Sequence, residues 1–180
     1  MRLGEWGTRA CIVVLGLISA IQPALAEGAV DKPVETWAEA ERNRELICLA
    51  EGIYFEARGE SIQGKLAVGR VILNRVKSEA YPDSVCDVVY QNKDRHNRCQ
   101  FSFACDGKPD RVKDRAQWQE ILMHAAWLLA SDLVDGSPPE VRNSTHYHAD
   151  YVKPKWAPYM KFMKKIGLHI FYKTYGGGWS

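Results

Sequence analysis

Glu56, in the segment YFEARGE at residues 54–60, is the side chain best suited to acid chemistry. Burial beside the two preceding aromatic residues would disfavour the charged carboxylate and raise the pKa of Glu56. A carboxyl group that stays protonated near neutral pH can give its proton to a glycosidic oxygen, the first step of glycan cleavage. The spacing also fits a helix-end glutamate that pairs with Arg58 or caps a turn. The residues by themselves leave both interpretations open.

A second carboxyl group, Glu60, follows four residues later and would share a helix face with Glu56 if the helix continued. Gly59 lies between them and is a natural helix stop. We therefore expect Glu60 to have a structural role or to orient the substrate. Hydrolysis of a glycan by water normally needs a partner carboxylate at a defined separation from the acid, and no other acidic residue stands out.

Three histidines motivate a different class of enzyme. His146 and His148 alternate, so they would share one face of a strand, and His169 could join them from a neighbouring strand. Three protein ligands are enough for a catalytic zinc site, which gives the alternative of a zinc amidase or peptidase that cuts peptide stems. The pair lacks the H-E-x-x-H spacing of zinc peptidases. We expect hydrogen-bonding roles for these histidines and no metal or other cofactor.

The N-terminus predicts export. Arg2 and Arg9 precede an apolar run at residues 10–21, and Ala24-Leu25-Ala26 follows as an A-x-A exit. This is the pattern of a secretory signal peptide over residues 1–26, and the run is too short to span a membrane. We expect cleavage after Ala26, a secreted or periplasmic location, and no stable membrane insertion afterwards.

The cysteines agree with export. Four remain after cleavage, at positions 48, 86, 99 and 105, and an even number in an exported chain indicates disulfides. Four cysteines allow three pairings. The short loop between Cys99 and Cys105 favours that bridge, which leaves Cys48 for Cys86. No C-x-x-C pair is present, and this weakens the competing interpretation of a zinc site.

Charge and length limit the function further. Without residues 1–26 the chain carries 22 basic and 21 acidic residues. This balance gives no argument for nucleic acid, whose binding proteins carry basic patches or stripes. The remaining length of about 150 residues fits one domain. We expect one catalytic module that acts as a monomer.

Periodicity predicts the elements that position these residues. Apolar residues recur at intervals of three and four in three segments, which predicts helices from 42 to about 55 or 57, at 63–76 and at 114–133. Residues 81–111 contain Pro, Gly and three cysteines with little periodicity, so we expect an irregular, disulfide-held region. Aromatic and β-branched runs at 145–148 and 168–173 predict short strands. The fold class is therefore α+β, a mostly helical domain with a small antiparallel sheet. The domain would span residues 42–174, between a linker at 27–41 and a flexible tail at 175–180.

An ordered series of motifs resembles a known family. The motifs are CLAEGIYFEARGE at 48–60, QGKLAV at 63–68, VILNRV at 71–76, CQFSF at 99–103, HYH at 146–148 and GLHIFY at 167–172. Together they resemble the cell-wall hydrolase family that includes spore cortex-lytic enzymes, over residues 46–173. The resemblance implies a lysozyme-like fold and cleavage of the bond between N-acetylmuramic acid and N-acetylglucosamine in peptidoglycan. It also implies that Glu56 is general acid and then base.

The resemblance extends to the outcome of lytic transglycosylases, in which one glutamate suffices. The carboxylate left after proton donation takes a proton from the C6 hydroxyl of muramic acid, and a 1,6-anhydro product forms. Further residues are candidates for binding the glycan, by hydrogen bonds or by stacking on sugar faces. They are Glu60, Gln100, Ser102, Phe103, Tyr147, His148 and Trp156. Ordinary packing of the aromatic members remains open, and so does a domain that binds glycan without cutting it.

Overall fold

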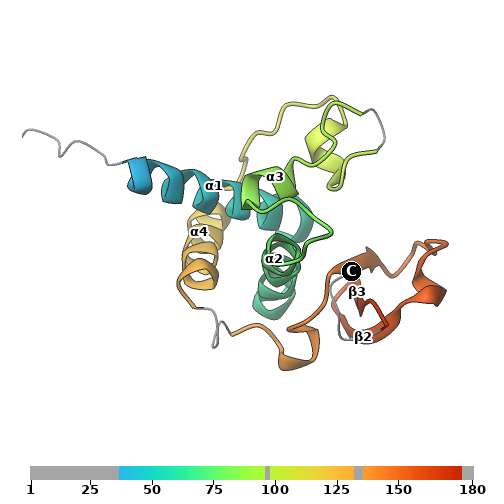
Figure 1. The fold of residues 1–180 in the computed structure, drawn as a ribbon. Coiled ribbons are helices and arrows are strands. Elements are labelled where there is room, and N and C mark those ends of the chain that lie inside the picture. The colour runs from blue at the N-terminus through green and yellow to red at the C-terminus, as the bar shows by residue number, and fades with distance from the viewer. Residues whose placement is uncertain (1–36, 96–97, 132–135, 176–180) are drawn as a thin grey trace, which may run out of the picture. The chain divides into compact units, whose positions relative to one another are not determined.

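The structure is a computed structural model that describes residues 37–95, 98–131 and 136–175 (Figure 1). The predicted signal peptide at 1–26, residues 27–36 of the predicted linker and residues 176–180 of the predicted tail lie outside the described residues. Within the described part, no helix combines the length and the apolar character needed to cross a membrane.

Four α-helices in the described residues build the larger part of the core. They are α1 (Trp37–Ala57), α2 (Ile62–Val76), α3 (Val85–Val89) and α4 (Arg115–Ala130). Helix α1 packs against the other three helices, and its Leu49, Ile53 and Tyr54 side chains are fully buried. It begins earlier than the predicted start at Arg42, so part of the predicted linker is helical. Its residues 39 and 41–44 are exposed, which explains why this part of the helix shows no apolar periodicity.

The turn between α1 and α2 fixes where the first helix ends. Helix α1 stops at Ala57, and the Ser61 side chain caps α2 by accepting a hydrogen bond from the Gly64 backbone N–H at 3.3 Å. Further along α2, Gly69 allows close helix packing, because a Cβ there would meet Leu128 of α4 and Ile53 of α1. Because α1 ends at Ala57, the turn after it separates Glu60 from the helix that carries Glu56.

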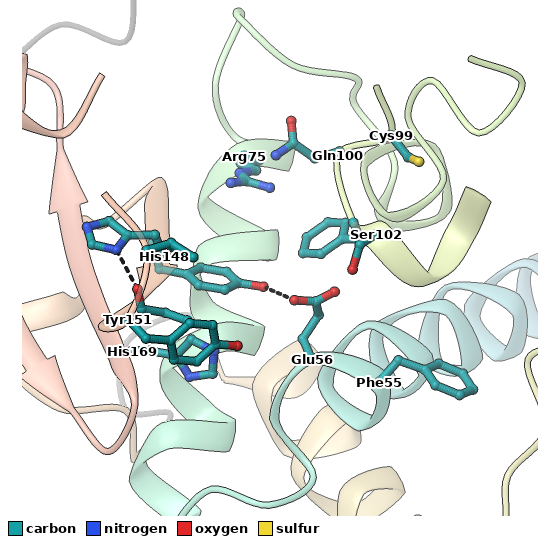
Figure 2. Close-up of a pocket in the computed structure, with 13 residues that line it drawn as sticks. Phe55, Glu56, Arg75, Cys99, Gln100, Ser102, His148, Tyr151 and His169 are labelled. Atoms are coloured by element: carbon teal, nitrogen blue, oxygen red, sulfur yellow. Dashed lines mark hydrogen bonds between the residues drawn. The ribbon is translucent and has the colours of Figure 1, made fainter. Parts of the chain in front are cut away.

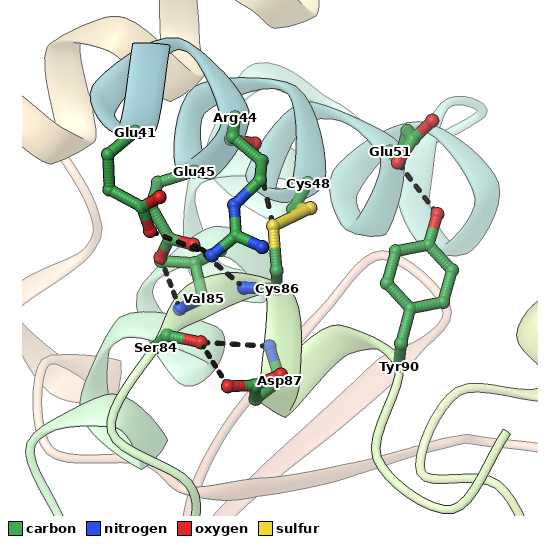
Figure 3. Close-up of a disulfide and its surroundings, with 10 residues drawn as sticks. All are labelled: Glu41, Arg44, Glu45, Cys48, Glu51, Ser84, Val85, Cys86, Asp87 and Tyr90. Atoms are coloured by element: carbon green, nitrogen blue, oxygen red, sulfur yellow. Dashed lines mark hydrogen bonds and ion pairs between the residues drawn. A yellow bond between two sulfur atoms is a disulfide. The ribbon is translucent and has the colours of Figure 1, made fainter. Parts of the chain in front are cut away.

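The region after α2 is more regular than the sequence indicated, since it contains α3 and a 3-10 helix, η1 (Ser102–Cys105). The Glu45 carboxylate of α1 accepts hydrogen bonds from the first backbone N–H groups of α3, at 2.5 Å from Val85 and 3.4 Å from Cys86 (Figure 3). One disulfide joins Cys48 of α1 to Cys86 of α3. A second joins Cys99 to Cys105 and closes the loop around η1.

Three antiparallel strands follow the helices: β1 (His146–Ala149), β2 (Lys161–Ile166) and β3 (His169–Lys173), in the order β1-β3-β2. Tyr147 pairs with Phe171 and Ala149 with His169, so these four side chains share one face of the sheet. Phe171 is fully buried and belongs to a second apolar cluster that includes Val68 and Val71 of α2. The mostly helical α+β prediction is confirmed.

Candidate active site

A cavity of 460 Å³ lies where the ends of α1 and α2, the Cys99–Ser102 loop and β1 come together (Figure 2). A volume of this size is typical of sites for small molecules or short polymer segments. Its lining is rich in polar and aromatic groups: Phe55, Glu56, Arg75, Cys99, Gln100, Phe101, Ser102, Tyr147, His148, Ala149, Tyr151, Val152 and His169. Glu56 is the only acidic residue among the described residues that line this cavity.

Glu56 lies in the last turn of α1 and is half-buried. The Tyr147 hydroxyl donates a hydrogen bond to Glu56 Oε2 at 3.0 Å (Figure 2). Burial raises the pKa of Glu56, and the Tyr147 hydrogen bond and the nearby Arg75 charge oppose this effect without cancelling it. The carboxyl group is therefore set to hold a proton at higher pH than an exposed glutamate, which suits a general acid.

Arg75 is a buried cation behind Glu56 that sequence reasoning did not single out. Its Nε donates to the Thr145 carbonyl oxygen at 2.8 Å, and its guanidinium lies 5.3 Å from the ring centroids of both Tyr81 and Phe101. With its amide oxygen turned toward Arg75, Gln100 accepts hydrogen bonds from both terminal nitrogens, at 3.0 and 3.3 Å. Arg75 thus connects α2, β1 and the Cys99–Ser102 loop around the carboxyl group.

A signal for Arg75 was present in the sequence. Asn74 and Arg75 are adjacent polar residues in a helix whose neighbouring positions are apolar, and both are buried. Asn74 Nδ2 donates to the carbonyl oxygens of Arg142 and Ser144, each at 2.7 Å. Buried polar side chains of this kind are retained only where they are hydrogen-bonded. The pair holds the chain that enters β1 and so positions Tyr147.

Glu60 is already bonded within the protein. Its side chain is 9% exposed, with Oε1 3.5 Å from His169 Nδ1. The same oxygen accepts a hydrogen bond from the Leu168 backbone N–H at 3.1 Å. Gly167 has a φ of 54°, and a Cβ at that position would collide with the Glu60 carboxylate. Glu60 therefore holds the β2–β3 turn through these contacts, as a structural or orienting residue would. It also lines a smaller hollow of 200 Å³ beside Glu56.

The histidines do not converge on one point. His148 Nδ1 is 2.8 Å from the Ala149 carbonyl oxygen, so it donates, and Nε2 then accepts from the Tyr172 hydroxyl at 3.1 Å. His169 lies on the opposite sheet face from His146 and His148, because it pairs with Ala149. Within the described residues, no three His, Cys, Asp or Glu side chains are grouped so that they could hold a metal ion. This geometry does not favour the zinc alternative.

His146 lies on the same face of the sheet as His148, opposite the face that carries Tyr147 and His169. It contacts the Thr145 hydroxyl at 2.9 Å and the Tyr81 hydroxyl at 3.3 Å. Burial and the Arg75 charge lower the pKa of His146 to about 4, so the ring is neutral near pH 7. Its role is that of a structural hydrogen-bonding group.

The structure shows which of the other predicted binding residues line the cavity. Gln100, Ser102 and His148 line the cavity. Phe103 is buried and stacks on Phe55 with ring centroids 4.8 Å apart, so it packs the loop onto α1. Trp156 does not line the cavity and instead packs against His146, His148 and Tyr172. Tyr147 lies in the wall, where its hydroxyl is bonded to Glu56. Of the two residues predicted to stack on sugars, Tyr147 thus lines the cavity and Trp156 lies outside its lining.

Comparison with known proteins places this chain in a family. The Cell Wall Hydrolase family profile matches residues 59–172, and the chain therefore belongs to that family. The catalytic domain of the Bacillus cereus SleB protein has a similar structure, with a TM-score of 0.54 and 30% identity, over 73% of this chain and 91% of that one. The catalytic domain of SleB from Bacillus anthracis, a germination-specific lytic transglycosylase, gives a TM-score of 0.53 and 30% identity. That similarity covers 72% of this chain and 93% of that domain.

Curated relatives are longer proteins. The spore cortex-lytic enzyme of Bacillus cereus is 30% identical over 129 residues, which is 72% of this chain and 44% of the relative. The spore cortex-lytic enzyme of Bacillus subtilis is 28% identical over the same share of this chain and 37% of its own length. The chain thus spans less than half the length of these relatives.

Proposed function

We propose that this chain cleaves the glycan strands of peptidoglycan at the bond between N-acetylmuramic acid and N-acetylglucosamine, with Glu56 as the proton donor. One observation carries the proposal: Glu56 is the only acidic residue among the described residues lining the 460 Å³ cavity, and burial raises its pKa. The family profile begins at residue 59, so the role of Glu56 rests on this geometry and on the sequence resemblance.

A single carboxyl group can perform both proton transfers of a lytic transglycosylase. Protonated Glu56 gives its proton to the glycosidic oxygen, and the bond from that oxygen to C1 of muramic acid breaks. The resulting carboxylate takes the proton of the C6 hydroxyl, whose oxygen bonds to C1 and closes a 1,6-anhydro ring. The proton lost in the first step returns in the second, and no water is consumed. Tyr147 and Arg75 stabilise the carboxylate between the two steps.

The relatives support this class of reaction. Two similar structures are SleB catalytic domains, and the one from Bacillus anthracis is a germination-specific lytic transglycosylase. For the chain as a whole, we propose envelope peptidoglycan as the partner and a monomer as the active form. We also propose a catalytic domain at residues 42–174 that is exported after removal of residues 1–26. Two disulfides in the described residues support an oxidising compartment. N-terminal sequencing of the mature protein would test the cleavage site.

The decisive test is Glu56→Gln, which keeps the size of the side chain and removes its exchangeable proton. We expect release of fragments from purified peptidoglycan to fall by at least about 100-fold, the lower end for loss of a general acid or base. Glu51→Gln is the matched control, because Glu51 lies on the same helix and bonds Tyr90 outside the cavity. That control should keep its activity.

Mass spectrometry of the fragments identifies the reaction. Wild-type products should end in 1,6-anhydromuramic acid. Reducing muramic ends would mean that water is the nucleophile and that a second carboxylate acts. More than about a tenth of wild-type activity in Glu56→Gln would be incompatible with a general acid at this position.

A further inference from the structure

Tyr151 is an exposed aromatic residue that lines the cavity and that no motif had indicated. Its side chain is 79% exposed, so the ring is accessible to a ligand. It lies two positions beyond the end of β1 and lines the 460 Å³ cavity near Glu56 and His169 (Figure 2). Within the described residues, its hydroxyl has no hydrogen-bond partner.

The same residue also lines the 200 Å³ hollow on the Glu60 side of the cleft. Among the described residues, the two hollows share Glu56, Ala149, Tyr151 and His169. The groove therefore continues past the acid instead of ending at it. A polymer cut at Glu56 needs binding space on both sides of the broken bond, and the two hollows provide it.

The backbone that carries Tyr151 is held in place although the ring is exposed. The Val152 N–H donates to the Ala149 carbonyl oxygen at 3.0 Å, and the Asp150 N–H donates to the Leu168 carbonyl oxygen at 2.8 Å. The Asp150 carboxylate also pairs with Lys165 Nζ at 2.6 Å. This turn is thus bonded to β2 and to the β2–β3 turn. A ring on a fixed turn loses little conformational entropy when it binds a ligand.

We propose that Tyr151 is a sugar-stacking residue that divides the cleft into two saccharide subsites, one on each side of Glu56. The inference rests on the proposed function, because it assigns both hollows to the same glycan strand. One face of a pyranose ring presents C–H groups that pack on an aromatic ring, and the free hydroxyl offers a hydrogen bond to a sugar substituent. Polar groups of the larger hollow, Gln100 and Ser102, then fix the sugar that binds there.

Binding of a saccharide to a cleavage-deficient variant measures recognition separately from cleavage. In the Glu56→Gln protein, affinity for a peptide-free tetrasaccharide of alternating N-acetylglucosamine and N-acetylmuramic acid would be measured by calorimetry. Tyr151→Ala should weaken binding by about tenfold, which is the upper range for one aromatic contact. Tyr151→Phe and Tyr151→Trp should stay within about threefold of the parent, because they keep a stacking ring.

Tyr159→Ala is the matched control. Tyr159 is 81% exposed, almost the same as Tyr151, but it lines neither hollow. Its removal should leave binding unchanged. In the active protein, Tyr151→Ala should raise KM by about tenfold with less than about a threefold change in kcat, because stacking acts on bound substrate and transition state alike.

The inference and the proposed function fail in different ways. Unchanged affinity in Tyr151→Ala, an equal loss in Tyr159→Ala, or no binding by the Glu56→Gln parent would each overturn the stacking role. If the wild type left glycan strands intact while tetrasaccharide binding still depended on Tyr151, the proposed cleavage would be wrong and the saccharide site would stand.

Discussion

The hydrogen bond from Tyr147 to Glu56 gives a direct prediction about the pH dependence of cleavage. A phenol that donates to a carboxylate favours the charged form, so it lowers the pKa of Glu56 against the raising effect of burial. Tyr147→Phe removes this donor and keeps the ring, which packs against Phe171 and His169. The variant should therefore hold the Glu56 proton to higher pH than the wild type.

The size of the effect follows from the bond. A hydrogen bond to a charged group contributes about 1.5–3 kcal/mol, and one pH unit corresponds to about 1.4 kcal/mol. Because Glu56 is only half-buried, water replaces part of the lost interaction, and we expect the lower end. The alkaline limb of the kcat/KM profile should move up by about one pH unit. The plateau should fall by less than about tenfold, since the proton donor remains.

The assay is the initial rate of soluble fragment release from purified peptidoglycan between pH 4 and 10, for wild type and variants. Tyr90→Phe is the control, because the Tyr90 hydroxyl makes the same kind of bond, to Glu51 Oε2 at 2.7 Å, outside the cavity. Its profile should match the wild type. An alkaline limb that stays in place or moves down in Tyr147→Phe would refute the assigned role of Tyr147, and an equal shift in Tyr90→Phe would show that the effect is not local.

Three further outcomes are expected. Alkylation of the mature protein without reductant should modify no thiol, because all four cysteines are bridged; two or more reactive thiols would contradict the pairing. Treatment with EDTA should change the cleavage rate by less than about twofold. Full loss of cleavage that zinc restores would instead support the zinc-enzyme alternative. The free energy of unfolding should fall as pH drops from about 6.5 to about 4, because the pKa of His146 is lowered to about 4 in the fold and the unfolded chain takes up that proton first. Urea titrations should show a shallower fall in His146→Asn, and an unchanged slope would remove His146 as the cause.

The sequence predicts those elements whose apolar pattern faces the core. Helix α2 was predicted at 63–76 and found at Ile62–Val76, because one of its faces packs on α1 and α4 while another meets the sheet. Strand β2 was not predicted. It is an edge strand with a bulge between Phe162 and Lys164, and most of its side chains are at least partly exposed. The bulge breaks the period-two pattern on which such a prediction depends.

The candidate site was likewise only partly predictable from the sequence. The setting of Glu56 was expected from its aromatic neighbours, which are close in sequence. Its partner Tyr147 is 91 residues away, and only the pairing of β1 with β3 turns that ring toward α1 and away from the sheet face that carries His148. Arg75 and Tyr151 reach the cavity through α2 and the turn after β1, and no local pattern indicates which face of each element lines a cleft.

The contrast between Glu56 and Glu60 bears on the choice between the two reaction outcomes. A hydrolytic partner would have to be a carboxylate free to activate water. Glu60 accepts a backbone hydrogen bond from Leu168, lies 3.5 Å from His169 and has its turn fixed by the left-handed Gly167. Each of these contacts restrains the carboxylate. Moving it toward a water molecule would break the contacts that hold the β2–β3 turn. Glu56 has one phenol donor and a pKa raised by burial. Two carboxyl groups four residues apart thus differ in their hydrogen-bond partners: Glu60 binds the β2–β3 turn, whereas Glu56 faces the 460 Å³ cavity and accepts from Tyr147. With Glu60 committed to structure, the hydroxyl of the substrate itself is the nucleophile that this cavity favours.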